Sequence, residues 1–477
     1  MSCSAILLAA AVSVNFGSEI GKIRPELHSS GFGPQICSCP QENIDAVKSM
    51  GFKASRTHDW ALINPNERVC DYFHIFPLMH LDAKDPRNYV FGPTDYLLKR
   101  TREEVGHDVF YRLGTSIEHS GPKIHFNSLI PEDFDKVAEI FAGTVRHYNR
   151  GWANGHEWNI KYWELWNEPD GFNNMWCLPD GDGGVGETEA AQKADRKARD
   201  LKRRELFVKF FVVCLKRLKS EFPDIKVGGP AMCSMNVDYF RAILQGCKEA
   251  GVAPDFISWH HYCNDVKQIL GAIERGRKLC DEFGFTNCEL IINEWHFFDY
   301  ARYSWYDLRS PKPEIQAKVW SGPASHNGID SSCFTLTMLA KFQTSKLDQA
   351  YYYGCRNVGA WGFMNEKKGK YKVYYGLKMF GDFVRRCQTM CASTGTDKIT
   401  VIAGKGADGG KTLLVADYRS GEQEIAIDVK GVAPGSKPTV WLHDYTHDLV
   451  QVPAELSDGK LLLKKTDTNS AAFLVTF

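Results

Sequence analysis

The sequence predicts a (β/α)8 barrel, also called a TIM barrel, followed by a smaller antiparallel β-sandwich. From about residue 21 to residue 388, eight short β-rich runs alternate with helical patterns. After about residue 390 the pattern changes to short runs of alternating hydrophobicity separated by turn residues. We therefore expect a barrel over 21–388 and an accessory β-sandwich over 389–477, joined by an N-terminal strand within 1–20.

The eight barrel strands are expected in regular order along the chain. Their predicted ranges are 22–28, 52–57, 109–114, 161–167, 226–229, 256–260, 289–294 and 349–354. The clearest helix begins at Pro131, because the fixed φ of proline suits a first helical turn. Phe134, Val137, Phe141 and Val145 then recur at helical spacing on one face. Further helices are expected over 189–222 and 374–387.

A doubly wound open sheet is the rival architecture. It would carry a glycine-rich phosphate turn after its first strand. Here residues 28–34 read HSSGFGP, which lacks the third glycine at the required spacing and has no clear helix start. The barrel is therefore favoured, and the smaller domain is assigned strands at 399–403, 412–417, 424–429, 439–443 and 471–477.

Composition excludes several classes of partner. The 58 basic and 58 acidic residues balance, whereas nucleic acid or an anionic membrane surface needs a basic excess. No run of about 20 apolar residues resembles a membrane span. The 12 Trp, 19 Tyr and 28 Phe indicate a large aromatic core more than ligand platforms.

The 15 cysteines are interpreted as reduced and buried, which favours a cytoplasmic location. Neither Cys37/Cys39 nor Cys387/Cys391 belongs to a set with zinc-ligand spacing, so we expect no metal and no other cofactor. The apolar segment 5–14 has no Lys or Arg before it, which favours a strand over a signal peptide. A secreted or periplasmic protein remains the alternative if residues 1–16 are a signal remnant.

Polar residues collect where the predicted barrel strands end, which is where barrel enzymes place their active sites. The second strand ends at Arg56, His58 and Asp59, and the third runs on to Glu118 and His119. Two glutamates, Glu168 and Glu294, lie at the ends of the fourth and seventh strands. Cleavage of a glycosidic bond needs two such carboxylates, one protonated and one ionised. A lone glutamate at a strand end is more often structural, but this ordered pair favours catalysis.

The motifs around these residues are similar to those of the large clan of retaining (β/α)8 glycosidases. They are WNEP at 166–169 and the Asn293–Glu294–Trp295 set. RTHDW at 56–60, FISWHHY at 256–262 and the C-terminal β-sandwich resemble glycoside hydrolase family 39, which contains β-xylosidases and α-L-iduronidases. The resemblance covers roughly residues 20–477.

The resemblance implies that Glu168 is the general acid/base, that Glu294 is the nucleophile, and that Arg56 is a cation beside Glu294. Asn167 would bind the sugar 2-hydroxyl, and Tyr262 would donate to the nucleophile. The substrate-binding residues it implies are Asn167, His58, Arg56, His260, Tyr262, Tyr353 and Trp361. His58 could instead form a structural pair with Asp59, and His260 could be a core histidine. Tyr353 and Trp361 are alternative sugar platforms.

The expected activity is therefore retaining hydrolysis of oligosaccharides or glycosides, exo-acting on β-linked pentosides by double displacement. An α-L-iduronidase-like or other glycosidase of the family is the alternative, because YYYGCRNVGAWGF at 351–363 departs from the family's Tyr-Trp pattern and the seventh strand reads NEW where TEW is commoner. A carbohydrate-binding protein without catalysis is the third possibility.

Glu164 lies in the same strand as Glu168. If the strand stays regular, Tyr162, Glu164, Trp166 and Glu168 share one orientation. Glu164 would then be buried roughly 13 Å below the rim, at ~3.3 Å per residue. We expect it to pair with a cation, for which Arg56 and Lys53 are the candidates.

Overall fold

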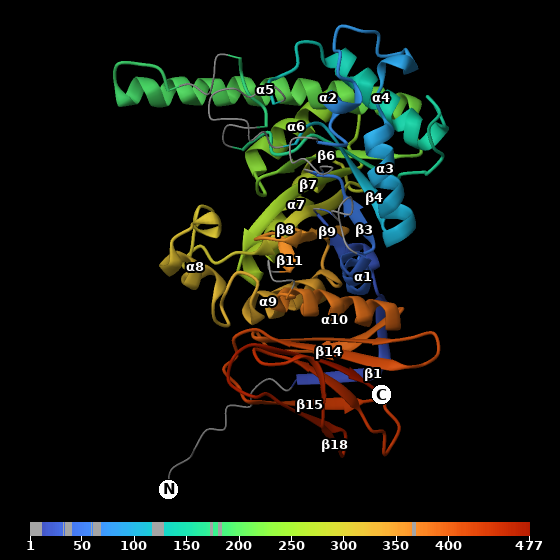
Figure 1. Cartoon of the computed structure of the whole chain (residues 1–477), viewed down its shortest axis with the longest axis vertical. Helices are drawn as coiled ribbons and strands as arrows, with labels where there is room; N and C mark the ends of the chain where they lie inside the picture. The colour runs from blue at the N-terminus through green and yellow to red at the C-terminus, as the bar shows by residue number, and fades with distance from the viewer. Residues whose placement is uncertain are drawn as a thin grey trace.

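A computed structural model describes residues 12–31, 33, 41–58, 60, 68–116, 128–171, 175–179, 184–364 and 369–477. In these residues a closed eight-stranded barrel lies against one large curled sheet, with α9 (Ile329–Phe342) and α10 (Lys372–Arg386) between them (Figure 1). The predicted fold class is confirmed.

All neighbouring barrel strands are parallel, and the last strand pairs with the first to close the barrel. The strands are β2 (Ser29–Ser30), β3 (Ala54–Arg56), β4 (Asp108–Leu113), β5 (Tyr162–Leu165), β6 (Lys226–Met232), β7 (Phe256–Cys263), β8 (Glu289–Phe297) and β9 (Gln349–Tyr352). Because parallel strands in a barrel all end on one face, residues that follow them in sequence meet around one opening.

The predicted first strand over 22–28 is wrong. Lys22 ends β1 (Val12–Lys22), which belongs to the other sheet, and Pro25–Leu27 forms a 3-10 turn. Proline has no N–H to donate to a ladder, so Pro25 breaks the extended run. The barrel strand is the short β2 that follows.

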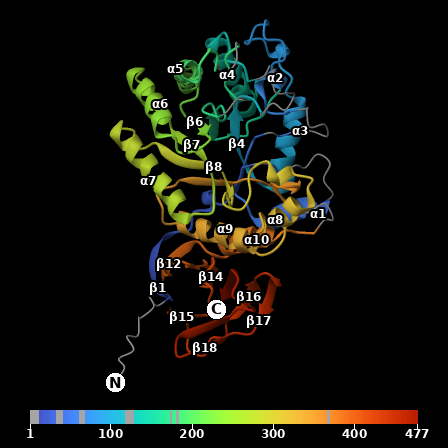
Figure 2. The ribbon, with the colours of Figure 1, turned by 90° about the vertical axis from the view of Figure 1, so that its left-hand side faces the viewer.

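Helices surround the barrel in the outer layer (Figure 2). Besides α9 and α10 they are α1 (Gln41–Met50), α2 (Tyr72–Ile75), α3 (Gly92–Arg100), α4 (Phe134–Arg150), α5 (Glu189–Glu221), α6 (Val237–Glu249), α7 (Val266–Glu282) and α8 (Pro313–Trp320). Short helical turns lie at Pro86–Asn88, Thr101–Val105 and Asp307–Arg309. Among the described residues, no helix has both the length and the hydropathy of a membrane span.

The N-terminus of α4 differs from the prediction. The helix begins at Phe134 and not at Pro131, because the Asp133 side chain accepts a hydrogen bond from the Lys136 amide and acts as the N-cap. Val137 and Phe141 are buried, as the spacing predicts.

The second sheet has ten strands in the order β17-β16-β20-β14-β13-β12-β1-β15-β19-β18. Its later strands are β12 (Thr389–Thr394), β13 (Ile399–Lys405), β14 (Lys411–Asp417), β15 (Glu424–Lys430), β16 (Thr439–His443), β17 (Asp448–Val452), β18 (Glu455–Ser457), β19 (Lys460–Lys464) and β20 (Ala471–Thr476). A separate pair, β10 (Arg356–Val358) and β11 (Gly362–Met364), follows the barrel.

The curled sheet encloses its own apolar core, which includes Phe16, Val415, Ile427 and Val475. The pairs are antiparallel except that β1 runs parallel to β15. The N-terminal strand therefore lies in the middle of the C-terminal sheet.

Polar contacts join the barrel to this sheet. Asp330 of α9 accepts from Arg419 at 2.7 Å and from the Ser470 hydroxyl at 2.6 Å. Ser332 and His443 form a hydrogen bond of 3.0 Å. Twelve cysteines lie within the described residues. All twelve are free thiols, and all but Cys233 are buried.

Candidate active site

Glu168 and Glu294 meet at the carboxyl ends of β5 and β8. His260 of β7 lies between them, with its Nδ1 2.7 Å from an oxygen of Glu168 and 3.4 Å from an oxygen of Glu294. One oxygen of each glutamate lies within 4.8 Å of the other. The Glu168 side chain is 24% exposed and the Glu294 side chain 5%, so one carboxylate faces solvent and the other is buried.

Arg56, fully buried at the end of β3, links three residues of the site. Its Nη1 donates to Glu294 at 2.8 Å and its Nη2 to Oδ1 of Asn167 at 2.8 Å. Its Nε donates to Glu164 at 2.6 Å. The predicted partner of Glu164 is therefore confirmed as Arg56, whereas Lys53 pairs with Asp108.

Glu164 accepts two more hydrogen bonds at its other oxygen. Ser258 donates at 2.6 Å and the Asn293 amide at 2.7 Å. This buried carboxylate is thus surrounded by donors and fixes Arg56 beneath the two catalytic candidates. Ser258 was missed in the sequence, although it lies two residues before His260 and so on the same side of its strand.

Burial and the neighbouring donors act in opposite directions on the pKa of Glu294. Burial raises the pKa of Glu294, while Arg56 and the Tyr262 hydroxyl, which donates at 2.7 Å, stabilise the carboxylate. His58 Nε2 lies 3.3 Å from the oxygen that Arg56 contacts. Each Glu294 oxygen therefore accepts one strong hydrogen bond, from Arg56 or from Tyr262.

The two histidines beside Glu294 are neutral at neutral pH. Burial lowers the pKa of His260 to about 4. Burial, with the adjacent Arg56 charge, lowers the pKa of His58 well below its ordinary value. Arg56 is therefore the cation in direct contact with Glu294 among the described residues.

The strand does not stay regular as far as Glu168. Trp166 and Glu168 have positive φ angles of 73° and 45°, which non-glycine residues adopt at a cost of about 1–3 kcal/mol. Trp166 turns outward and packs against Trp176 and Phe210. The expectation that Trp166 and Glu164 share an orientation is wrong, because the backbone turns after Leu165 and so brings Glu168 to the rim.

Asn167 presents a free donor at the site. Its Oδ1 accepts from Arg56, but its buried Nδ2 has no hydrogen-bond partner among the described residues. A buried, unsatisfied N–H is costly. A hydroxyl group of a bound ligand would satisfy it.

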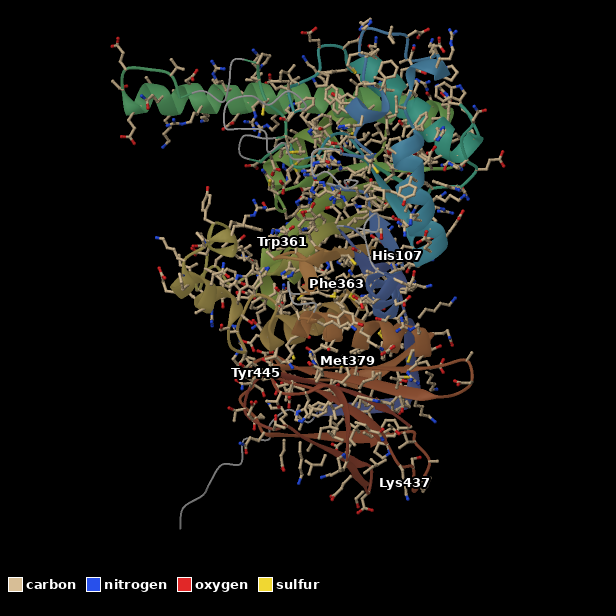
Figure 3. All side chains as sticks on the ribbon, in the orientation of Figure 1. His107, Trp361, Phe363, Met379, Lys437 and Tyr445 are labelled. Atoms are coloured by element: carbon tan, nitrogen blue, oxygen red, sulfur yellow. The ribbon has the colours of Figure 1, made fainter. Side chains whose placement is uncertain are left out.

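Aromatic rings surround the mouth of the site. Trp361 contacts Tyr353 at 5.4 Å and Tyr262 at 5.6 Å between ring centroids, so both predicted platforms lie in one cluster. Trp361 lies beside the α8 segment in Figure 3. Trp305 packs on Trp361 at 5.3 Å and is 41% exposed. Sequence reasoning missed Trp305, which lies in the segment after the seventh barrel strand.

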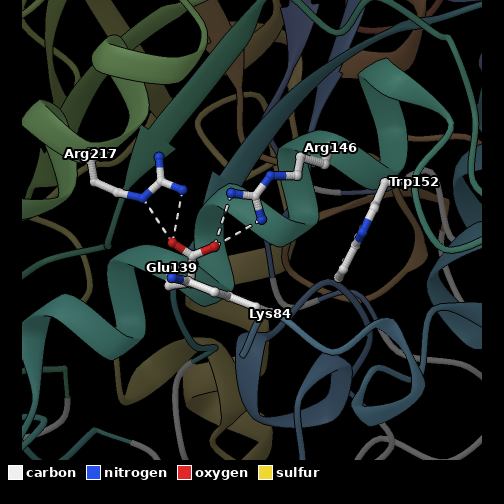
Figure 4. A pocket seen from close by; sticks show the side chains of 5 residues that line it. All are labelled: Lys84, Glu139, Arg146, Trp152 and Arg217. Carbon is white, nitrogen blue, oxygen red and sulfur yellow. Dashed lines mark hydrogen bonds and ion pairs between the residues drawn. The ribbon is translucent and has the colours of Figure 1, made fainter. Parts of the chain in front are cut away.

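The hollow in Figure 4 is separate from this site. A hollow on the outside of the barrel is lined by Lys84, Glu139, Arg146, Trp152 and Arg217 (Figure 4). Glu139 pairs with Arg146 and Arg217, so its charge is already compensated. Asp59, Glu118 and His119 lie outside the described residues.

Glu168, His260 and Glu294 have a spacing that could also hold a metal ion. A direct hydrogen bond of 2.7 Å joins His260 Nδ1 and Glu168. His260 Nδ1 thus faces both carboxylates and lies closer to Glu168 than to Glu294.

The chain is similar to two curated β-xylosidases. It is 28% identical over 134 residues to one from Geobacillus stearothermophilus, covering 28% of this chain and 21% of that protein. It is 24% identical over 280 residues to one from Caldicellulosiruptor saccharolyticus, covering 54% of this chain and 46% of that protein. The chain thus matches less than half the length of each relative. No protein-family model matches the chain.

Solved structures share the fold over nearly the whole chain. A glucosidase from Croceicoccus marinus has a TM-score of 0.72 and 19% identity, covering 98% of both chains. A family 51 α-L-arabinofuranosidase from Bifidobacterium longum has a TM-score of 0.61 and 12% identity, covering 98% of this chain and 99% of that one. The resemblance to (β/α)8 glycoside hydrolases is confirmed at the level of fold and sequence similarity, and membership of family 39 stays a prediction.

Proposed function

We propose that the chain is a retaining glycoside hydrolase that removes β-linked pentose units from the ends of oligosaccharides or glycosides. The observation that carries the proposal is the separation of Glu168 and Glu294, whose nearest oxygens lie within 4.8 Å. Retaining enzymes hold their carboxyl groups about 5–5.5 Å apart, and inverting enzymes hold them farther apart to admit water. The pentose follows from the similarity to proteins named β-xylosidases.

In this mechanism Glu294 attacks the anomeric carbon while Glu168 transfers its proton to the leaving oxygen. The bond from Glu294 to the sugar replaces the glycosidic bond. Glu168, now ionised, takes a proton from water, which attacks the same carbon and releases Glu294. The greater exposure of Glu168 supports this assignment, because the acid/base must reach both the leaving group and water.

The neighbouring residues have roles that match their contacts. Arg56 and Tyr262 orient Glu294 and stabilise its ionised form against burial, and Nδ2 of Asn167 is free to bind the sugar 2-hydroxyl. His260 Nδ1 and Glu168 share a hydrogen bond of 2.7 Å, and Tyr353 and Trp361 form a wall for the sugar ring. The enclosed position of Glu294 supports action on a terminal sugar.

The Glu294→Ala variant tests the assignment. It should lose turnover of an aryl β-xyloside by several orders of magnitude, and azide should restore it, giving a glycosyl azide of inverted configuration. The matched variant Glu289→Gln changes a glutamate at the other end of β8 and should keep activity. Near-normal turnover by Glu294→Ala would contradict the assignment.

A screen of nitrophenyl pentosides, hexosides and uronides would identify the sugar. Faster release from uronides would favour the iduronidase-like alternative. Tight sugar binding without release of nitrophenol from any of them would favour a carbohydrate-binding protein. The free, buried cysteines support a reducing compartment as the place of action.

A further inference from the structure

A second cluster of potential ligands lies in the outer layer, where α3 meets the end of α4. Asp95 of α3, His147 of α4 and His156 of the following loop each offer one atom, and the three atoms lie within 4.8 Å of one another. Residues 151–160 lead from α4 to the start of β5, so the cluster lies on the face of the barrel opposite the carboxyl ends of the strands. It is separate from the candidate active site.

The hydrogen bonds of His147 leave a lone pair directed at Asp95. Its Nδ1 is 3.0 Å from the carbonyl oxygen of Trp152, which can only accept, so Nδ1 carries the proton. In the neutral ring Nε2 is then an acceptor, yet it lies 3.0 Å from Oδ1 of Asp95, an acceptor that also takes a hydrogen bond from the Tyr148 hydroxyl at 2.9 Å. Two facing acceptors need either a second proton or a cation between them. Metal-binding histidines commonly donate their other N–H to a carbonyl in this way.

His156 adds an independent observation. Its Nε2 is buried, has no hydrogen-bond partner among the described residues, and lies 3.8 Å from the same Asp95 oxygen. The ring is held by stacking on Trp158 at 3.9 Å between centroids.

The loop that carries His156 is fixed against α4. The His156 amide donates to the His147 carbonyl at 2.6 Å, and the Trp158 amide to the Tyr148 carbonyl at 2.8 Å. Gly155 makes this approach possible, because a Cβ there would lie 2.1 Å from the His147 carbonyl oxygen. The two imidazoles are thus placed together by the backbone before any ligand arrives.

We propose that Asp95, His147 and His156 bind a divalent transition-metal ion of the zinc type. Ligand atoms about 2.0–2.1 Å from a tetrahedral ion lie about 3.3 Å from one another, and the observed 3.0 and 3.8 Å separations from Asp95 lie on either side of that value. Two imidazoles and a carboxylate suit zinc, cobalt or nickel more than calcium or magnesium. The Asp95 and His156 side chains are each 27% exposed, so the cluster lies close to the surface.

Calorimetric titration of the chelator-treated protein with zinc tests the site. The wild type should bind one ion at this site, and at one hundred times the dissociation constant the midpoint of thermal unfolding should rise by about 3 °C. Cobalt at the same site should give the visible absorption of a tetrahedral complex. His156→Gln and Asp95→Asn should weaken binding at least tenfold without loss of fold.

Two control variants separate this site from others. His74→Gln removes an exposed histidine on α2 and should leave binding unchanged. Glu168→Gln removes one carboxylate of the other possible cluster and should also retain the ion. Absence of zinc binding in the wild type, or equal binding by His156→Gln, would overturn the proposal and leave the cluster as a protonated histidine paired with Asp95.

Discussion

At the scale of single residues, the two glutamates of β5 and the segment after it differ in what surrounds them. Glu164 accepts from Arg56, Ser258 and Asn293 and is fully buried. Glu168 contacts His260 and faces solvent. The first therefore supports the site, and the second has the exposure that the proposed acid/base needs.

Glu164→Gln should lower the free energy of unfolding by about 3–5 kcal/mol, as expected for removing one partner of a buried ion pair. The amide of glutamine would also direct N–H groups at existing donors. Denaturant unfolding measures the loss. Glu289→Gln, in a partly exposed pair with Lys226, is the control and should lose no more than about 1 kcal/mol. A shifted pH–rate profile with unchanged stability would show that Glu164, not Glu168, titrates in catalysis.

Asn167→Ala should reduce kcat/KM about 100-fold on substrates with a 2-hydroxyl group, because a preorganised donor is lost. On the matching 2-deoxy glycosides the loss should be only a few-fold. The ratio of the two losses in kcat/KM cancels any general effect of losing the contact between Asn167 and Arg56. Equal losses on both would mean that Asn167 only positions Arg56.

At the scale of elements, the segment between β8 and α8 adds an aromatic surface to the site. Trp305 contacts Tyr262 and Trp361 and remains partly exposed. Tyr262 in turn holds Glu294. The segment therefore connects the aromatic cluster with Glu294, the proposed nucleophile.

Trp305→Ala should raise KM for xylo-oligosaccharides by up to about tenfold, since one aromatic contact is worth about 0.5–1.5 kcal/mol. The kcat should change little because Tyr262 keeps its bond to Glu294. Steady-state kinetics with oligosaccharides of increasing length measures the effect. Tyr306→Ala is the matched control, because Tyr306 is 89% exposed. A loss of kcat without a change in KM would contradict a platform role.

Most barrel strands could be predicted from the sequence because buried β-rich runs alternate with amphipathic helices. The first strand could not, because β2 has only two residues and a longer neighbouring run belongs to the other sheet. The predicted ends of the fourth and seventh barrel strands carry Glu168 and Glu294, and the two residues do meet at one opening of the barrel. Contacts across the barrel, such as Ser258 to Glu164, depend on register between distant strands, which the sequence does not state.

At the scale of the whole molecule, burial of neutral histidines makes stability depend on pH. Five fully buried histidines have pKa values lowered by burial to about 4, or about 3 for His107; they are His28, His107, His260, His296 and His443. In the unfolded chain they titrate near 6.5. Between about pH 4 and pH 6.5 the unfolded state therefore binds more protons than the folded state.

Stability should therefore be complete above about pH 6.5 and fall as the pH drops toward 4. Each histidine contributes at most about 1.4 kcal/mol per pH unit in that window. Scanning calorimetry from pH 7.5 to 4.5, in buffers of different ionisation enthalpy, should show a falling unfolding midpoint and proton uptake on unfolding. A midpoint that stays constant from pH 7 to pH 5 would contradict this.

The position of β1 determines how early the chain can finish folding while it is being synthesised. Phe16 of β1 contacts Cys391, 375 positions later, and the strand lies between β12 and β15. At about 5–20 residues per second a ribosome needs roughly 20–75 s to make that length. Throughout that interval β1 has emerged without its partners, and its unpaired edge is open to other chains. Nascent chains of this protein should therefore depend on chaperones until the last sheet is made.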